Sequence, residues 1–171
     1  MEFFDVLKKR RSIREFRDKK IPADKVRKIL AATKLCPTAG NAQAYDVVIV
    51  KKPKTIKALA SSFSHHAESL SEAPMMLVFL ANKAVGAEMF GRRGADFYCV
   101  QDATIACSYA QLAVRAVGLA SVWVGGFEEG LVRRILNAPS NVRPVAILPV
   151  GYGAEKPRAR KRVDRARKEG Y

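Results

Sequence analysis

The sequence predicts a layered fold of the α/β or α+β class. Helical and strand patterns alternate along the chain without a run of either kind. Of the 171 residues 49% are hydrophobic, which is enough to bury the core of a single domain spanning residues 1–171. No linker or internal repeat divides the chain, and residues 153–171 are expected to form a basic tail.

The first half of the chain has the pattern helix, helix, loop, strand, helix. The predicted segments, in that order, are residues 2–9, 22–35, 36–44, 45–50 and 53–62. The second helix starts at Pro22, and its apolar residues follow the i, i+3, i+4, i+7 spacing of one buried face. The pattern in residues 64–73 is too weak to predict an element.

The second half contains the longest helical pattern, from Asp96 to Val117. Its many small residues indicate a helix packed closely on most sides, and Gly118 is a natural stop for it. Residues 82–94 show no strong period and are predicted to be a mobile loop or a frayed helix. The remaining predicted elements are strands at 75–81, 119–124 and 142–152 and a helix at 128–136.

The net charge of +15 is large for this length and lies mainly in residues 8–28 and 156–168. Such a charge attracts nucleic acid, an anionic membrane surface or a phosphorylated small molecule. Aromatic residues are not interleaved with the basic ones as they are in nucleic-acid stacking platforms. A nucleic-acid-binding protein is therefore the weaker interpretation of this charge.

Several classes of protein are not indicated. No apolar run approaches the roughly 20 residues that span a membrane, and the first residues lack a signal-peptide core, so a cytoplasmic location is expected. The three cysteines form neither an even set nor a Cys-x-x-Cys pair, which argues against a disulfide framework. His65 and His66 are adjacent and point apart in a regular element, so no metal site is expected.

The segment Arg10–Phe16 places three arginines and a serine within five residues. In an extended stretch Arg10, Ser12 and Arg14 would point the same way while Ile13 turns inward. Arginine forks and a small hydroxyl suit the oxygens of a phosphate. On composition alone a solvated basic turn is the better explanation of the segment.

Two further segments have polar or glycine-rich patterns that a ligand could use. The loop around Thr38, Asn41 and Gln43 offers amide donors and acceptors suited to a heteroaromatic ring edge. Gly125-Gly126 follows a predicted strand, and paired glycines allow a backbone to come close to a flat ligand. Ordinary turn chemistry is the alternative explanation for both.

Taken together, four segments resemble the nitroreductase family of flavin mononucleotide (FMN) enzymes, in the order expected for it. They are RRSIREF (10–16), CPTAGNAQAYDVVIV (36–50), QDATIACSYAQLAVRAVGLASVWVGGF (101–127) and VAILPVGYGAEKPRARKR (145–162). The family pattern in the second segment is Pro-Ser-x-x-Asn-x-Gln-Pro-Trp, and this chain departs from it at Ala44-Tyr45. Residues 55–95 are short for the family, and no equivalent of its flavin-contacting asparagine is evident there.

The resemblance implies a three-layer α/β/α fold of the α+β class, with a mixed, largely antiparallel central sheet flanked by helices. It also implies a homodimer with tightly but non-covalently bound FMN at the subunit interface. The cofactor-binding residues that it implies, grouped by segment, are Arg10, Arg11, Ser12 and Arg14; Pro37, Thr38, Asn41 and Gln43; Val124, Gly125 and Gly126; and Arg158 and Arg160. The two arginine sets would hold the phosphate, and the other two sets would line the ribityl chain and the ring.

The activity implied by the resemblance is hydride transfer from NAD(P)H through FMN to a nitroaromatic, a quinone or another small acceptor, in ping-pong order. No catalytic side chain is expected, since the cofactor performs the chemistry. Other chemistry of the family remains an alternative: enone reduction, dehalogenation or flavin fragmentation.

Overall fold

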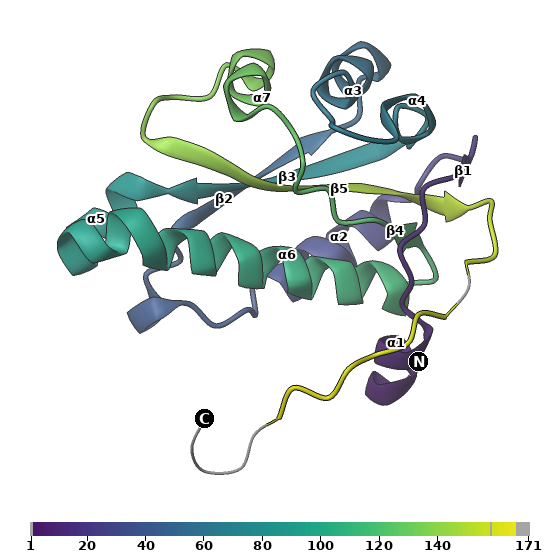
Figure 1. Ribbon diagram of the computed structural model, residues 1–171, viewed down its shortest axis with the longest axis horizontal. Helices are drawn as coiled ribbons and strands as arrows, with labels where there is room; N and C mark the ends of the chain where they lie inside the picture. The colour runs from purple at the N-terminus through teal and green to yellow at the C-terminus, as the bar shows by residue number, and fades with distance from the viewer. Residues whose placement is uncertain (1, 158, 167–171) are drawn as a thin grey trace.

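A five-stranded sheet separates two layers of helices in the computed structural model, which describes residues 2–157 and 159–166 (Figure 1). The strands follow the order β1-β5-β3-β2, with β4 also paired to β5, and these pairings are antiparallel. Their bounds are β1 (Phe16–Arg17), β2 (Tyr45–Val50), β3 (Met75–Asn82), β4 (Ala120–Ser121) and β5 (Val142–Gly153).

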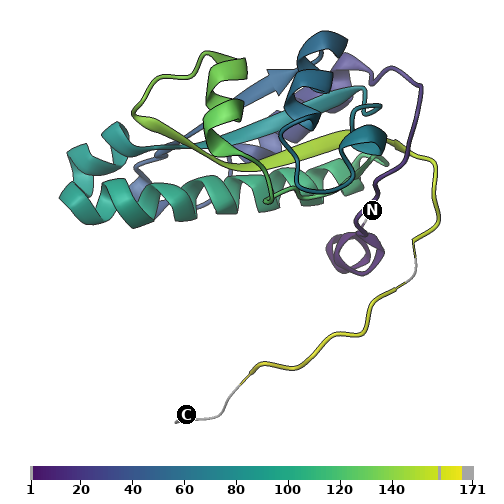
Figure 2. The same cartoon turned by 45° about the horizontal axis from the view of Figure 1, so that its top comes forward.

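One face of the sheet is covered by α2 and α6, and the other by α3, α4 and α7 (Figures 1 and 2). Helix α5 lies against the start of α6, and α1 lies below the opposite end of the molecule (Figure 1). The helices are α1 (Phe3–Lys9), α2 (Ala23–Thr33), α3 (Pro53–Ala60), α4 (Ala67–Leu70), α5 (Lys83–Arg93), α6 (Cys99–Ala116) and α7 (Glu129–Leu136). The predicted three-layer α+β fold is confirmed.

The central strand β3 is buried on both faces. Its odd-numbered residues pack in the cluster with α2 and α6, among them Leu77 and Phe79. Its even-numbered residues, such as Met76 and Val78, pack in the cluster on the α3 and α7 side. Because successive strand residues point to opposite faces, a continuous apolar run is what a strand covered on both sides requires.

Helix α6 is the long helix that the small-residue pattern predicts. Ala103, Ala106, Cys107 and Ala110 are fully buried, so the helix packs closely on the sheet and on α2. It ends before Gly118, whose φ of 76° favours glycine at this stop. Both predictions about this helix are confirmed.

Three segments differ from their sequence-based prediction. Residues 83–93 form helix α5, so of the two alternatives predicted for residues 82–94 the mobile loop is wrong and the helix is correct. Asn82 caps this helix by accepting a hydrogen bond from Val85 N, and the helical backbone breaks only at Phe90 and Gly91. The strand expected at 119–124 is regular only at β4, although Val124 forms one further bridge with Ile147. The short strand β1 and helix α4 were not predicted, because neither is long enough to show a period.

The C-terminal tail follows β5 without regular structure in residues 154–157 and 159–166. It leaves the sheet beside β1, runs past α1 and then departs from the body (Figures 1 and 2). Within the described residues, no helix is both long and apolar enough to cross a membrane.

A salt bridge ties helix α7 to strand β5. The Arg143 guanidinium donates to both carboxylate oxygens of Glu129, with N–O distances between 2.8 and 3.3 Å. This hydrogen bond lowers the pKa of Glu129 below its ordinary 4.5. A carboxyl group with a lowered pKa in the folded state stabilises the fold above its ordinary pKa, and this stabilisation is lost as the pH falls through the folded-state pKa.

We expect Glu129→Gln to lower the free energy of unfolding by less than about 1 kcal/mol at pH 7, because both side chains are half exposed to solvent. The difference from the wild type should begin to shrink as the pH falls below 4.5 and should disappear once the pH has fallen through the lowered folded-state pKa, where the wild-type carboxyl group becomes protonated. Urea denaturation at pH 7 and pH 3.5 measures both effects. Glu128→Gln is the control, since its contact with Arg134 is longer, at 3.6 Å, and more exposed; an equal loss in the control would contradict this account.

Candidate functional site

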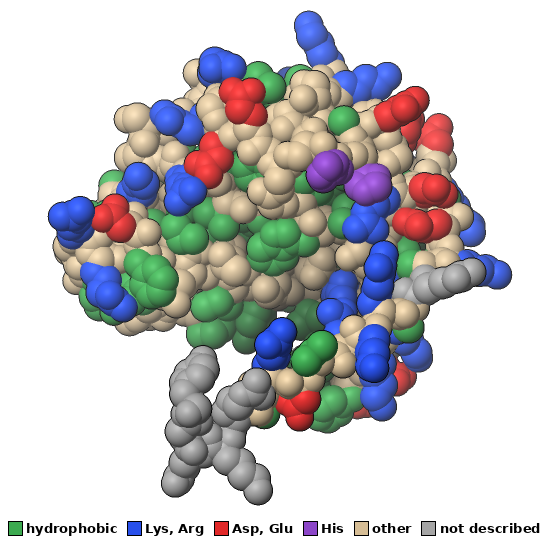
Figure 3. Space-filling view, viewed as in Figure 1, with side chains coloured by type: hydrophobic (Ala, Val, Ile, Leu, Met, Phe, Trp, Pro, Cys, Tyr) green, Lys and Arg blue, Asp and Glu red, His purple; other side chains and the backbone are tan. Residues whose placement is uncertain are grey.

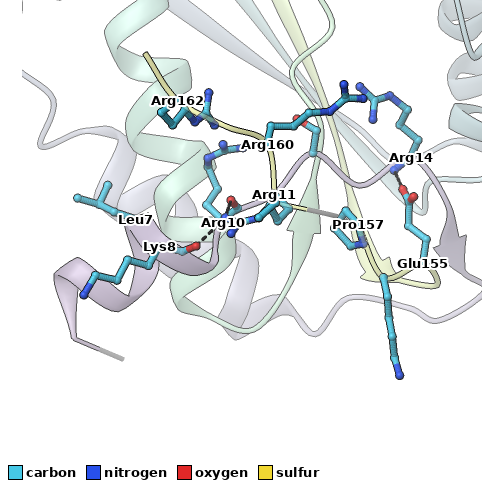
Figure 4. A pocket seen from close by; sticks show the side chains of 12 residues that line it. Leu7, Lys8, Arg10, Arg11, Arg14, Glu155, Pro157, Arg160 and Arg162 are labelled. Atoms are coloured by element: carbon cyan, nitrogen blue, oxygen red, sulfur yellow. Dashed lines mark hydrogen bonds between the residues drawn. The ribbon is translucent and has the colours of Figure 1, made fainter. Parts of the chain in front are cut away.

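A cavity of about 890 Å³ opens between the Arg10–Arg14 segment and the C-terminal tail (Figure 4). We call it the phosphate cavity, for the anion that its side chains suit. Its lining is predominantly basic: Leu7, Lys8, Arg10, Arg11, Ser12, Arg14, Glu155, Lys156, Pro157, Ala159, Arg160 and Arg162. Figure 3 shows Lys and Arg side chains gathered over this part of the molecule, around α1 and the tail.

The backbone of the arginine segment is fixed to the body beside strand β4. Ile13 N donates to Ser121 O at 3.1 Å, and Ser12 forms a parallel bridge with Ser121. The Ile13 side chain is only 8% exposed, so its predicted inward direction is confirmed. Arg10, Ser12 and Arg14 line the cavity together, in agreement with their alternation around Ile13.

The tail brings further arginines to the same cavity. In Figure 4 the side chains of Arg14 and Arg160 point toward each other, and the end of Arg10 lies near Arg162. Burial lowers the pKa of Arg10, and the charges of Arg162 and Arg11 lower it further. Glu155 is the one carboxylate among the described lining residues. Like charges held this close favour an anion between them.

Two contacts hold the segment and the tail in place. A carboxylate oxygen of Glu155 accepts a hydrogen bond of 2.5 Å from Arg14 N, which joins the tail to the segment. Arg11 Nη1 donates to Lys8 O and Arg10 O, at 2.6 and 2.8 Å, and so satisfies carbonyls at the end of α1. Arg11 thus has a structural contact in addition to its place in the cavity lining.

The loop of residues 36–44 is organised by Asp102, a buried carboxylate on α6 that is 1% exposed. One of its oxygens accepts from Ala39 N at 3.0 Å, and the other accepts from Ala44 N at 3.1 Å. Two backbone donors separated by five residues are thereby held by one side chain. Asp102 was not predicted, because one acidic residue in a helical pattern is usually solvent-exposed.

The loop has an unusual backbone that leaves its amide side chains exposed. Gly40, Asn41 and Gln43 have φ values of 50°, 60° and 52°. Gln43 N donates to Thr38 Oγ1 at 3.1 Å, which helps to hold Gln43 in this conformation. A β-carbon at Gly40 would lie 2.7 Å from the Phe90 ring, so glycine is required both by the backbone and by this contact. Pro37, Asn41 and Gln43 are exposed, and Thr38 is half-buried.

The structure does not bring this loop to the phosphate cavity within one chain. The loop is held by Asp102 near the start of α6, whereas the arginine segment lies near Arg115 and Gly118 at its end. At 1.5 Å per residue Asp102 and Arg115 are roughly 20 Å apart along this helix. Two groups of predicted site residues are therefore separated in the protomer.

The glycine segment lies beside the loop that follows α3, where Gly126 O accepts from Ser64 N at 2.9 Å, and it does not line the phosphate cavity. Val124 is buried and exchanges backbone hydrogen bonds with Ile147, at 2.9 and 3.0 Å. Gly125 and Gly126 are exposed, and they follow the strand that begins beside Ser12. Of the second arginine set, Arg160 lines the phosphate cavity, and Arg158 lies outside the described residues. Lys8 and Arg162 also line this cavity and were not predicted.

Comparisons with known proteins agree on one family. The sequence model of the "Nitroreductase family" matches residues 7–72 and 64–152. A protein of Archaeoglobus fulgidus with the provisional name NADH dehydrogenase/NAD(P)H nitroreductase is 31% identical over 84% of this chain and 80% of its own length. An iodotyrosine deiodinase of Haliscomenobacter hydrossis is 24% identical over 90% of this chain and 80% of its own. The structure of an FMN-dependent nitroreductase from Clostridium difficile, 25% identical, aligns with a TM-score of 0.83 over 98% of this chain and 99% of that one.

We expect Asp102→Asn to lower the free energy of unfolding by about 1–3 kcal/mol, because an amide offers one acceptor where two backbone donors need one each. Hydrogen exchange at the Ala39 and Ala44 amides should become faster, and denaturant unfolding gives the free energy. Asp96→Asn, in an exposed pair with Arg92, is the control and should change little. Unchanged protection of both amides would show that Asp102 does not hold the loop.

Proposed function

The chain belongs to the nitroreductase family, and from this membership we propose that it is an FMN-dependent oxidoreductase. It transfers hydride from NAD(P)H, through FMN, to a nitroaromatic, a quinone or another small acceptor, in ping-pong order. The observation that carries the proposal is the phosphate cavity, where arginines from both ends of the chain converge around one space. FMN supplies the redox chemistry when it is bound.

The donor set fits the phosphate of FMN. That group carries up to two negative charges, and Arg10, Arg14 and Arg160 offer charge-assisted donors to its oxygens. The hydroxyl of Ser12 adds a neutral donor in the same lining. Gly125 and Gly126 are exposed and have no side chains, so a flat ring can approach the backbone of this segment closely.

A homodimer accounts for the separation of the loop from the cavity. Two copies related by a twofold axis, with their α6 helices antiparallel, place the start of one α6 beside the end of the other. The loop with Thr38, Asn41 and Gln43 then reaches the phosphate cavity of the neighbouring copy. FMN would sit at this interface, with its phosphate on one protomer and its ring near the loop of the other.

The apolar surface of α1 supports such a dimer. Phe3, Phe4 and Leu7 are 60%, 70% and 42% exposed, and Leu7 borders the phosphate cavity. Tyr109 on α6 is exposed as well. Large apolar side chains gathered at one end of a protein indicate a surface that a partner covers.

Reductive dehalogenation is a second candidate activity. It is favoured by the match to the iodotyrosine deiodinase of Haliscomenobacter hydrossis, which extends over 90% of this chain. It would use the same FMN site and differ only in the acceptor. Comparing a nitroaromatic, a quinone and iodotyrosine as acceptors separates the two activities.

The direct test is to purify the protein, reconstitute it with FMN and record its flavin absorbance. Bleaching by NADH and by NADPH measures reduction, and re-oxidation is then followed with a nitroaromatic, a quinone and iodotyrosine as acceptors. We expect bound flavin and parallel lines in double-reciprocal plots, the sign of ping-pong order. A colourless protein that cannot be reconstituted would falsify the proposal, and salt-sensitive retention on DNA by that protein would favour nucleic-acid binding.

Arg10→Ala should weaken FMN binding by about 1.5–3 kcal/mol, the usual range for a hydrogen bond to a charged group. Quenching of flavin fluorescence during titration measures the dissociation constant. The matched control is Arg92→Ala, since the Arg92 side chain is 96% exposed and lies far from the cavity on α5. Equal affinities in the two variants would remove Arg10 from the site.

Phe4→Glu should shift the protein from dimer to monomer and weaken FMN binding, because a carboxylate at the centre of an apolar interface cannot be solvated there. Light scattering coupled to size-exclusion chromatography measures the mass. Ile49→Glu, at an exposed position on the edge strand β2, is the control and should leave the mass unchanged. A Phe4→Glu protein that keeps the wild-type mass would exclude this face as the interface.

A further inference from the structure

A second basic cavity, of about 520 Å³, lies beside the first, and we call it the Arg115 pocket. It is lined by Lys9, Arg11, Ile13, Arg17, Arg115, Gly118, Leu119, Tyr152, Gly153, Glu155, Lys156 and Pro157. Its volume lies within the range of small-molecule sites. It is formed by the end of α6, by the start of the tail and by Lys9, Arg11 and Ile13 of the N-terminal segment.

The two cavities share part of their lining but differ in the residues that define them. Arg11, Glu155, Lys156 and Pro157 belong to both. Arg10, Arg14, Arg160 and Arg162 line only the phosphate cavity. Arg17, Arg115 and Tyr152 line only the Arg115 pocket. The two can therefore be altered independently.

Positive charge in the Arg115 pocket exceeds negative charge. Five cationic side chains line it against the single carboxylate of Glu155. Two more ammonium groups stand at its edge, since Lys19 Nζ and Lys25 Nζ lie 4.6 and 5.2 Å from the centre of the Tyr152 ring. Of the five lining cations, Lys9 has an ion pair among the described residues, with Asp5 at 3.1 Å.

One nitrogen of the half-buried Arg115 guanidinium lacks an acceptor among the described residues. Its Nε is shielded from solvent and has no hydrogen-bond partner among the described residues. A shielded donor without an acceptor costs about 1–3 kcal/mol, and more on a charged group. An anion placed among Arg17, Arg115 and Lys156 would neutralise the repulsion and accept from the guanidinium nitrogens that reach the cavity.

We propose that the Arg115 pocket is a second anion site, distinct from the FMN site, which binds a phosphate or diphosphate group of a small molecule. Arg115 and Arg17 provide the charged donors, and Lys156 adds a third charge. The hydroxyl of Tyr152 is a neutral donor in the same lining. The site needs only residues of one chain, so it does not depend on the dimer or on FMN.

Calorimetric titration of the full-length protein with inorganic pyrophosphate at low salt tests the proposal. We expect two classes of site in the FMN-free protein, and FMN should displace pyrophosphate from only one of them. Arg115→Gln should weaken the second class at least tenfold, the loss expected for a charged hydrogen bond, and leave the first unchanged. Arg10→Ala should weaken the first class of site and leave the second unchanged.

Arg133→Gln is the matched control. Arg133 on α7 also has a shielded Nε without a partner among the described residues, but it lines neither cavity. It should bind pyrophosphate as the wild type does. Arg17→Gln, at an exposed position, provides a second variant whose folding should not depend on the substitution, and its affinity should fall several-fold.

The proposal would be overturned if Arg115→Gln and Arg17→Gln bound pyrophosphate with the same affinity as the control. It would also be overturned if the protein had a single site that both Arg10→Ala and Arg115→Gln abolished. If FMN failed to bind while pyrophosphate still bound in the Arg115 pocket, the proposed FMN-dependent function would be rejected and the second anion site would be retained. Titration with adenosine 2′,5′-bisphosphate and with inorganic phosphate distinguishes a nucleotide source from a free anion. If Arg115→Gln lowered the affinity for a DNA duplex and left the affinity for pyrophosphate unchanged, the small-molecule site would also be rejected.

Discussion

The burial of strand β3 on both faces is the constraint on which the rest of the structure depends. A strand with apolar residues on both sides must be covered twice, and the chain does so with α2 and α6 on one face and α3 and α7 on the other. The small residues of α6 let this helix lie close to the sheet along its whole length. Its two ends then fix the places of the 36–44 loop and of the arginine segment.

At each end of α6 a polar contact turns a loop into a defined surface. Near its start, the Asp102 carboxylate holds Ala39 N and Ala44 N, and the loop between them exposes its amide side chains. Near its end, Ile13 anchors the arginine segment against Ser121, and Glu155 joins the tail to Arg14. Cations are held close together by contacts that do not use their charges, which leaves those charges for an anion.

The concentration of charge separates a small ligand from an extended one. Basic residues from the two ends of the chain surround two adjoining cavities instead of forming a stripe along the surface. A compact phosphate can use several of these donors at once, whereas a duplex needs contacts spread along its length. Both of our proposals rest on this geometry: FMN in the first cavity and a second phosphate group beside Arg115.

Local patterns in the sequence were sufficient to predict most helices and strands, the inward direction of Ile13 and the stop at Gly118, because each depends on neighbouring residues. The family resemblance added the three-layer arrangement. The role of Asp102, the arrival of Arg162 beside Arg10 and the shielding of Arg115 were decided only by the tertiary structure. Each of these joins residues more than 50 positions apart or depends on burial by distant segments, and a local period carries no information about which distant segments come into contact.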